Sequence, residues 1–377
     1  MALIAASAVR TCLGGGSATF ARLLAGDSGV TALRYVDPIS VNVKHGYHQP
    51  VQARANDEEP MFQATRWLAE CLTEVLAVAG PMLPPTPVPV LIGTGLRELR
   101  AVERHALDGR LVRPAQLHFA AAVREVSPLL GPVITISNAC SAAGHAVALA
   151  QDLVEHGEVE AAVAAGTDAM TASMLAMIGR VTDEPTEKIQ PFDKDRIGAL
   201  LGEGAAAVLV VPDSWNGPVA ARLLGTGMSC DAHHQTAPSL EGIVRAMEDA
   251  LARAGRRPTD VDIVVSHGTG TALNDVTEAR AIQRVLVDQG AAPWVTAVKG
   301  ALGHTSGASA LMSLDVAIRC LADGLVPPIV GLREPLAEAR ALRLVRGSPA
   351  RSAARIAQIN SFGFGGVNAV TLIETLS

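Results

Sequence analysis

Short apolar runs alternate along the chain with longer segments in which apolar residues recur at helical spacing. The short runs are continuously apolar, which is typical of strands covered on both faces of a sheet. Strands are therefore expected at residues 88–92, 133–136, 161–165 and 206–211. Helices are expected at residues 62–78, 141–156, 241–254, 275–288 and 306–322. The alternation of the two kinds of element predicts an α/β fold.

A stretch rich in turn-forming residues, 211–218, interrupts this pattern near the middle of the chain. It separates parts of similar element order, so we expect two halves, residues 1–213 and 214–377. No repeated sequence relates these halves, and only the order of the elements suggests a duplicated fold. Residues 108–113 and 182–195 are expected at the surface, and the arginines and glutamates mixed between 97 and 113 predict a solvated helix face.

The composition narrows the class of protein. Of the 377 residues, 49% are hydrophobic and 18% charged, a balance that fits a compact enzyme with a large core. The net charge of −6, without long runs of Lys or Arg, gives no general attraction for nucleic acid. No stretch of 18 apolar residues exists, so no membrane span is expected. The apolar N-terminus precedes Arg10, the reverse of a secretory signal, and predicts a buried first strand.

The cysteines are odd in number, widely spaced and without a Cys-x-x-Cys pair: Cys12, Cys71, Cys140, Cys230 and Cys320. This pattern suggests neither disulfides nor a zinc site, and reduced thiols in a cytoplasmic enzyme are expected. His233 and His234 lack a third metal ligand at a plausible spacing. The glycines at 14–16 lack the spacing and the lysine of a nucleotide-binding loop. We therefore expect no metal and no organic cofactor.

Cys140 is the first candidate for chemistry. It lies in Asn-Ala-Cys-Ser-Ala-Ala-Gly-His, between the strand at 133–136 and the helix at 141–156. Unpaired N–H groups and the dipole at a helix N-terminus favour an anion, so this placement is expected to lower the pKa of the thiol. Gly157 is expected to end the helix as a left-handed cap. A buried structural cysteine fits this motif, taken alone, about equally well.

Two further loops carry a histidine between a strand and a helix. His267 lies in Ser-His-Gly-Thr-Gly-Thr after the apolar run 261–265, and Asp275 and Glu278 begin the helix that follows. His304 lies in a glycine-containing loop that starts at Lys299, after the run 294–298. Glycines allow the sharp turns that bring an imidazole close to a ligand. Each histidine alone is more often structural, but two equivalent loops and a junctional cysteine predict one shared site.

The sequence Asn-Ser-Phe-Gly-Phe-Gly-Gly-Val-Asn at 360–368 forms another glycine-punctuated loop. Its backbone N–H groups could line a cavity and form one arm of an oxyanion hole. A glycine-rich turn that closes a last pair of strands accounts for the same residues, so both interpretations stay open.

In this order, the motifs around Cys140, His267 and His304 and the closing loop resemble those of elongating β-ketoacyl synthases, condensing enzymes of the thiolase superfamily. The resemblance extends over essentially the whole chain. Weaker similarities to the same family occur at 166–169, 192–198, 201–205 and 227–238.

The resemblance implies a five-layer αβαβα fold of two similar halves, and a homodimer. It implies that Cys140 takes an acyl group from a carrier-protein or coenzyme A thioester. His267 and His304 would then stabilise the enolate that forms when a malonyl thioester loses carbon dioxide. The N–H groups of Cys140 and Phe364 would hold the acyl oxygen, and Phe364 would gate acyl entry.

The same resemblance implies supporting roles for further residues. Lys299 would organise the second histidine loop, and Thr269 and Thr271 would hold the pantetheine arm of the substrate. Buried acidic residues would buttress the site, namely Glu203, Asp275 and Glu278.

The chain departs from the family pattern at several positions. Ser266 replaces a common alanine, Ile197 an acidic residue, and Val367 a threonine of the closing loop. Residues 56–59 are acidic near a region where carrier-docking residues are often basic. These differences bear on substrate size and carrier recognition rather than on the cysteine and the two histidines.

Three other functions fit parts of this pattern. An acyltransferase of the same fold would need Cys140 and a base but no malonyl decarboxylation, and the presence of both histidines and Lys299 favours condensation. A non-catalytic partner subunit is expected to lack a member of the Cys–His–His set. A thiolase would use a second cysteine near the closing loop, whereas no cysteine follows Cys320.

Overall fold

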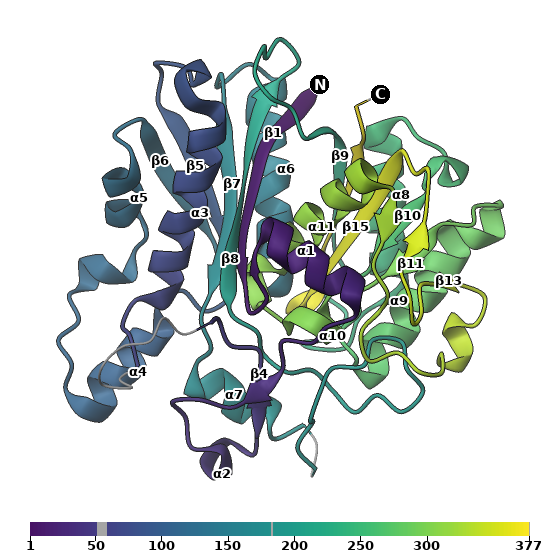
Figure 1. Ribbon diagram of the computed structural model, residues 1–377, viewed down its shortest axis with the longest axis horizontal. Helices are drawn as coiled ribbons and strands as arrows, with labels where there is room; N and C mark the ends of the chain where they lie inside the picture. Colours follow the sequence, from purple (N-terminus) through teal and green to yellow (C-terminus); the bar gives the residue numbers. More distant parts are fainter. Residues whose placement is uncertain (51–58, 182–183, 377) are drawn as a thin grey trace.

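The protein is described from a computed structural model, which covers residues 1–50, 59–181 and 184–376. Its two halves lie side by side and share one mixed sheet of 12 strands (Figure 1). The short β2 (Gly14–Gly15) pairs with β1 off the main strand order, which consists of the other eleven. From the centre outward, the N-terminal half contributes β1 (Ala2–Thr11), β8 (Gly204–Pro212), β7 (Ala162–Asp168), β5 (Val88–Gly93) and β6 (Leu130–Ile136). The C-terminal half contributes β9 (Ala221–Cys230), β16 (Val367–Glu374), β15 (Ile356–Gly363), β10 (Ile263–Val265), β11 (Trp294–Thr296) and β13 (Arg343–Leu344).

The strands of the two halves pair in the same pattern. In the N-terminal half, β1–β8 and β8–β7 are antiparallel, and β7–β5 and β5–β6 are parallel. In the C-terminal half, β9–β16 and β16–β15 are antiparallel, and β15–β10 and β10–β11 are parallel. The central strands β1 and β9 join the halves. The expected similarity of the halves is confirmed, while the boundary between residues 213 and 214 stays a prediction.

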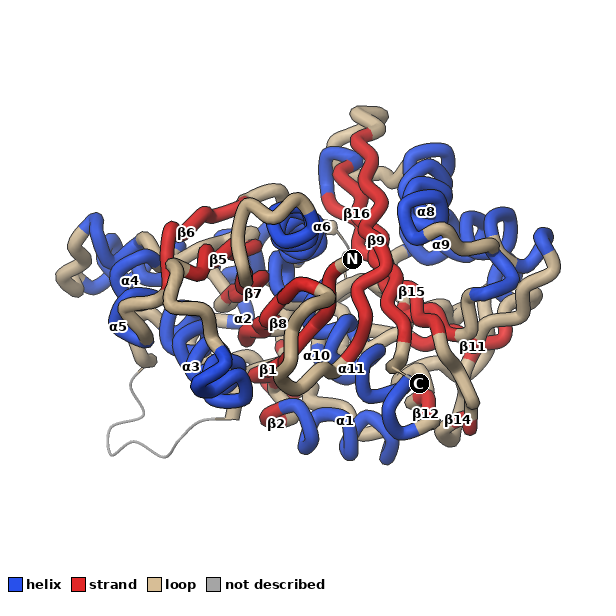
Figure 2. The backbone as a smooth tube through the Cα atoms, turned by 90° about the horizontal axis from the view of Figure 1, so that it is seen from above, coloured by secondary structure: helices blue, strands red, loops and turns tan. Residues whose placement is uncertain are grey.

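Helices and sheet alternate in five layers. Helix α3 (Gln63–Ala79) covers the outer face of β1, β8 and β7. Helices α6 (Ala142–Glu155) and α11 (Ser309–Asp323) contact each other and pack between the sheet halves. Helices α8 (Leu240–Ala254) and α9 (Ala272–Val285) lie together beyond β9 and β16 (Figure 2). The expected αβαβα arrangement is therefore confirmed.

Burial of α11 reflects its place in the middle layer. Twelve of its fifteen residues are buried, including the polar Ser313 and Asp315. A helix enclosed on nearly every side needs small or apolar residues all round, which explains its Ala- and Leu-rich sequence. In the part of the chain that the structure describes, no helix is long and apolar enough to cross a membrane.

The sequence located most elements correctly. The strand and helix beside Cys140 are β6 and α6, and Gly157 has the predicted left-handed φ of 70°. The prediction that 182–195 forms a surface excursion is wrong for 189–193, where Ile189, Phe192 and Asp193 are fully buried. Residues 182 and 183 lie outside the described residues, and both ends of the rest of the stretch are exposed, at Glu184, Glu187, Lys194 and Asp195. Backbone N–H groups of a distant segment bind the Asp193 carboxylate and hold this stretch against the C-terminal half.

Candidate active site

Cys140 lies on a sharp turn between a strand and a helix, as the sequence predicts. The turn is a short 3-10 helix, Ala139–Ser141, between β6 and α6. Ala139 has φ of 60°, a left-handed conformation that is uncommon for a residue with a side chain. The hydroxyl of Ser361, from β15, donates to the Cys140 carbonyl at 3.0 Å and fixes the turn to the C-terminal half.

His304 reaches Cys140 from the other half of the molecule. Its Nε2 lies 3.0 Å from the Cys140 Sγ, and its Nδ1 lies 3.1 Å from the hydroxyl of Ser309. The His304 backbone is held by Leu200 and Gly202, whose carbonyl and N–H bind its N–H and carbonyl. The ring of His267 stands edge-on to that of His304, with ring centres 5.5 Å apart. The structure thus brings the three predicted residues together.

Lys299 determines which ring nitrogen of His267 carries the proton. Its buried ammonium donates to the His267 carbonyl and lies 3.3 Å from the His267 Nδ1. An ammonium has only donors, so Nδ1 accepts and the ring proton resides on Nε2. Burial lowers the pKa of Lys299 to about 8, and the nearby Glu278 acts in the opposite direction. The lysine is therefore mostly charged at neutral pH.

Asp275 and Glu278 hold the loop that carries His267. Both side chains are fully buried on α9, in its first and second turns. Glu278 accepts the N–H groups of His267 and Gly268 at 2.7 and 2.8 Å, and Asp275 accepts that of Thr269 at 3.1 Å. Burial raises the pKa of both carboxyl groups, while backbone N–H donors lower it, those of His267 and Gly268 for Glu278 and those of Phe192 and Gly270 for Asp275. The two carboxylates therefore serve to bind the backbone of the His267 loop, rather than only to interact with the start of α9.

Apart from Glu203, the remaining predicted residues lie on two loops, the His267 loop and the closing loop. Thr269 and Thr271 place their hydroxyls 2.8 Å apart on the His267 loop. Phe364 follows β15, its side chain is 48% exposed, and its N–H approaches the Cys140 sulfur. The closing loop is the turn between the antiparallel strands β15 and β16, as one of the two interpretations of 360–368 expects. Its role as one arm of an oxyanion hole stays a prediction.

Glu203 lies beside the site rather than in it. Its carboxylate accepts the N–H of Gln49 at 3.1 Å and lies 3.3 Å from the Nδ1 of His48. Within the described residues it makes no hydrogen bond to the cysteine, the two histidines or the lysine. Its link to them is through the backbone, since the preceding Gly202 binds the His304 carbonyl.

The electrostatics of the site contradict one expectation from the sequence. Cys140 is partly accessible, yet the surrounding protein raises the pKa of its thiol to about 11. The charge of Lys299 and the N–H groups of Cys140 and Phe364 lower it less than burial raises it. Burial also lowers the pKa of His304 to about 3. At neutral pH the site therefore holds a thiol, neutral imidazoles and a charged lysine, and the helix N-terminus alone does not produce a thiolate.

Sequence reasoning assigned no role to Asp168 or Ser309. Asp168 ends β7 and is buried, and Ser309 begins α11 beside His304. An acidic residue three positions after the apolar run 161–165 is the signal that could have identified Asp168. A serine that follows a histidine by five positions carries no such signal.

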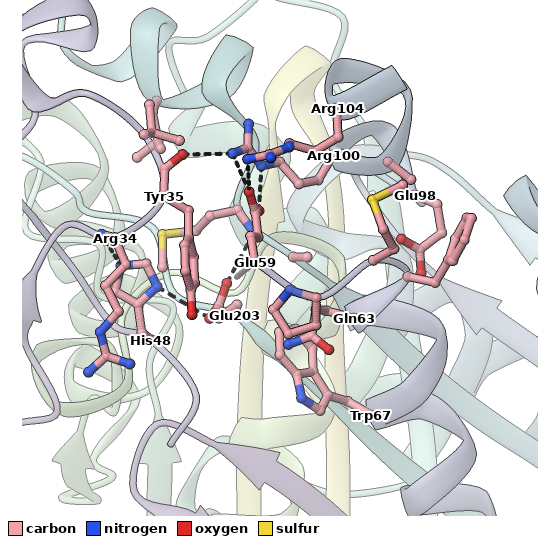
Figure 3. Close-up of a pocket in the computed structure, with 18 residues that line it drawn as sticks. Arg34, Tyr35, His48, Glu59, Gln63, Trp67, Glu98, Arg100, Arg104 and Glu203 are labelled. Atoms are coloured by element: carbon pink, nitrogen blue, oxygen red, sulfur yellow. Dashed lines mark hydrogen bonds and ion pairs between the residues drawn. The ribbon is translucent and has the colours of Figure 1, made fainter. Parts of the chain in front are cut away.

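A separate polar cavity lies near α4 (Leu99–Asp108) and contains none of the Cys140, His267 or His304 side chains (Figure 3). The predicted solvated helix face is wrong for Glu98 and Arg100, which are buried. Other charged residues of the same stretch are exposed, namely Arg97, Asp108 and Arg113. Arg100 is buried and pairs with Glu59 at 2.7 Å and with Glu103 at 3.1 Å. Glu98, also buried, accepts the hydroxyl of Thr65. Of the acidic stretch 56–59, only Glu59 lies within the described residues, and it faces these arginines rather than solvent.

Both halves of the chain are similar in sequence to known proteins. The family model "Beta-ketoacyl synthase, N-terminal domain" matches residues 39–215, and "Beta-ketoacyl synthase, C-terminal domain" matches 220–333. A 3-oxoacyl-[acyl-carrier-protein] synthase 2 of Rhizobium meliloti is 31% identical over 314 residues, covering 76% of this chain and 73% of that protein. Nodulation protein E of the same species is 34% identical over 249 residues, 64% of this chain and 61% of that protein.

Solved structures resemble the whole chain. The ishigamide ketosynthase/chain length factor aligns over 100% of this chain and 99% of its own, with a TM-score of 0.88 and 28% identity. A β-ketoacyl synthase from Burkholderia phymatum aligns over the same shares with a TM-score of 0.85 and 22% identity, which bears on the fold alone.

Proposed function

The chain belongs to the β-ketoacyl synthase family of the thiolase superfamily, and on that premise we propose that it condenses an acyl thioester with a malonyl thioester. Such a reaction would serve fatty acid or polyketide synthesis. The observation that carries the proposal is the 3.0 Å contact between the His304 Nε2 and the Cys140 sulfur, made across the two halves.

In the first step, Cys140 becomes acylated. The thiol proton passes toward the neutral Nε2 of His304, and the sulfur attacks the carbonyl carbon of the acyl thioester. The oxyanion that forms lies against the N–H groups of Cys140 and Phe364. The bond to the donor sulfur breaks, the acyl group stays on Cys140, and the proton leaves with the donor thiol.

In the second step, a malonyl thioester loses carbon dioxide. The electron pair of the broken bond moves to the α-carbon and the thioester oxygen, where Nε2–H groups of His267 and His304 stabilise it. The enolate carbon attacks the acyl carbonyl, and the bond from that carbon to the Cys140 sulfur breaks. The released thiolate takes a proton from solvent, because the original thiol proton left with the donor thiol. The His304 Nε2 accepts a proton in the first step and donates a hydrogen bond in the second, so its Nδ1 must be protonated in one case and unprotonated in the other. The Ser309 hydroxyl can accept from or donate to Nδ1 and is compatible with both forms.

Intact-protein mass spectrometry tests this sequence of steps. An acyl thioester is expected to add its acyl mass to the protein, and a malonyl thioester added next is expected to release a product two carbons longer. Acyl transfer to another acceptor without extension would favour the alternative, an acyltransferase that moves the group to oxygen, nitrogen or sulfur. No acyl adduct at all would contradict both.

The proposed donors are acyl carrier protein or coenzyme A thioesters. The relative from Rhizobium meliloti bears acyl-carrier-protein in its name, which supports a carrier as donor. Thr269 and Thr271 would hold the pantetheine arm, Phe364 would gate the acyl chain, and Glu203 would brace the His304 segment through its backbone. We place this chemistry in the cytoplasm.

A homodimer is proposed through β6, the strand at one edge of the sheet. Within the described residues, β6 pairs with β5 on one side and with no strand on the other. Ile134 of β6 is 42% exposed. An apolar, unpaired edge strand is a ready partner for a second strand. Ile134→Lys is therefore expected to convert a dimer into a monomer in sedimentation experiments, because it would bury an ammonium in the interface.

The matched control for this dimer test is Ile39→Lys, at an exposed isoleucine of α2 (Pro38–Val41). It is expected to leave the sedimentation coefficient unchanged. A wild-type protein that sediments as a monomer would contradict the homodimer.

A further inference from the structure

Asp168 is a buried carboxylate surrounded by donors. Its Oδ1 accepts the hydroxyl of Thr94 at 2.7 Å and the N–H of Leu96 at 2.8 Å. Its Oδ2 accepts the N–H of Gly95 at 2.9 Å and that of Gly307 at 2.6 Å. An ionised carboxylate can accept hydrogen bonds at both oxygens. A carboxamide or a protonated acid would instead point a hydrogen of its own at one of these four donors. The site is therefore built for a negative charge.

One of these four bonds crosses between the halves. Asp168, Thr94, Gly95 and Leu96 belong to the N-terminal half, which also carries Cys140, whereas Gly307 belongs to the C-terminal half. Gly307 lies in the short turn Ser306–Ala308, directly between His304 and Ser309. The bond from Gly307 therefore fixes the segment that holds both the His304 backbone and the hydroxyl bound to its Nδ1.

The backbone of the turn at Gly307 adopts a conformation that its sequence does not favour, so contacts with other segments must stabilise it. Ser306 has φ of 47°, in the left-handed region that side chains rarely adopt. A Cβ at Gly307 would collide with the backbone of Thr94, and one at Gly95 would collide with the Ser306 hydroxyl. The two loops thus pack backbone to backbone, and the carboxylate of Asp168 joins them.

We propose that Asp168 is a positioning residue, whose carboxylate fixes His304 against Cys140 across the junction of the two halves. The role rests on the proposed use of Cys140 as nucleophile. Charged groups that act on the sulfur are Asp168 and Lys299, of opposite sign. Loss of the Asp168 charge therefore changes the titration of the thiol as well as the geometry of its contact with His304.

The test compares Asp168→Asn with Asp193→Asn, both in a Cys230→Ala background that removes the exposed thiol. Asp193 is also fully buried and accepts backbone N–H groups, but of Asp195, Arg333 and Glu334. Two readouts are used: the rate of acyl-adduct formation by mass spectrometry, and the pH dependence of Cys140 alkylation by iodoacetamide.

Asp168→Asn is expected to slow acylation at least about tenfold, because a displaced His304 no longer meets the thiol. It is also expected to move the alkylation midpoint to lower pH, because Asp168 raises the pKa of Cys140. Asp193→Asn is expected to change neither. A folded Asp168→Asn protein with the wild-type acylation rate and alkylation midpoint would overturn the role.

Two further outcomes are distinguishable. If the wild type forms no acyl adduct, the proposed function fails, and the alkylation midpoint alone then decides for or against Asp168. If Asp168→Asn does not fold, Thr94→Val removes one donor at nearly constant volume and keeps the charge. Severalfold slower acylation in Thr94→Val supports the role, and an unchanged rate in the folded variant rejects it.

Discussion

Replacing Cys140 with alanine is expected to abolish the acyl adduct and to lower the condensation rate by about 10⁴-fold or more. Three of the other four thiols are too deeply buried to substitute for it, and the fourth, Cys230, is exposed and is tested separately. Cys12, Cys71 and Cys320 are buried, and burial raises the pKa of each. The adduct is measured by intact mass spectrometry with an acyl thioester.

The matched control for this variant is Cys230→Ala, which removes the exposed cysteine. It is expected to keep both the adduct and condensation. An adduct of the same mass on Cys140→Ala would show that another residue is the nucleophile. Loss of the adduct in Cys230→Ala would point to that cysteine.

The Cys140→Ala protein also separates the two proposed steps. It keeps His267, His304 and Lys299, so we expect it still to release carbon dioxide from a malonyl thioester. This partial reaction reports on the enolate-stabilising groups without the titration of the thiol. A complete loss of carbon dioxide release in the folded variant would contradict the separate roles of the cysteine and the histidines.

The substitution Lys299→Met is expected to cause the second large effect, a slower release of carbon dioxide from the malonyl thioester. Without the ammonium, nothing holds the proton of His267 on Nε2, so one donor to the enolate oxygen is lost. The loss of one such donor typically lowers a rate by about 10²- to 10³-fold. Carbon dioxide release is measured in the Cys140→Ala background, with Lys194→Met, at an exposed lysine, as the control.

The pH dependence gives an independent check on Lys299. Its pKa of about 8 lies below the usual value for lysine, so the group is charged below that pH and neutral above it. Cys140 is one of the groups that raise this pKa, so in Cys140→Ala carbon dioxide release is expected to fall as the pH rises toward about 8. The histidines contribute no change there, because burial keeps the pKa of His304 at about 3 and that of His267 well below its ordinary value.

Lys299→Met in the same background is expected to lack this fall, since it removes the titrating group. A rate that increases through pH 8 in the Cys140→Ala protein, or an identical fall in Lys299→Met, would assign the titration to another residue. The control Lys194→Met is expected to reproduce the parent profile.

Local features of the chain were predictable because their causes are local. Continuous apolar runs, a cysteine at a helix start and glycines beside each histidine located β6, α6 and the two histidine loops. Residues held by distant partners were not predictable in this way. Phe192 is buried because its neighbour Asp193 is bound by the backbone of 333–334, and Arg100 is buried because Glu59 meets it.

The sequence by itself determined the α/β class, the order of the elements and the identity of Cys140, His267 and His304 as candidates. Only the tertiary structure decided that His304 lies 3.0 Å from the Cys140 sulfur, and that Asp168 joins its loop to the other half. It also decided that the thiol rests protonated, because burial outweighs the helix N-terminus. The reason is that periodicity and turn chemistry act between neighbours in sequence, whereas contact and burial depend on which distant segments the fold packs together.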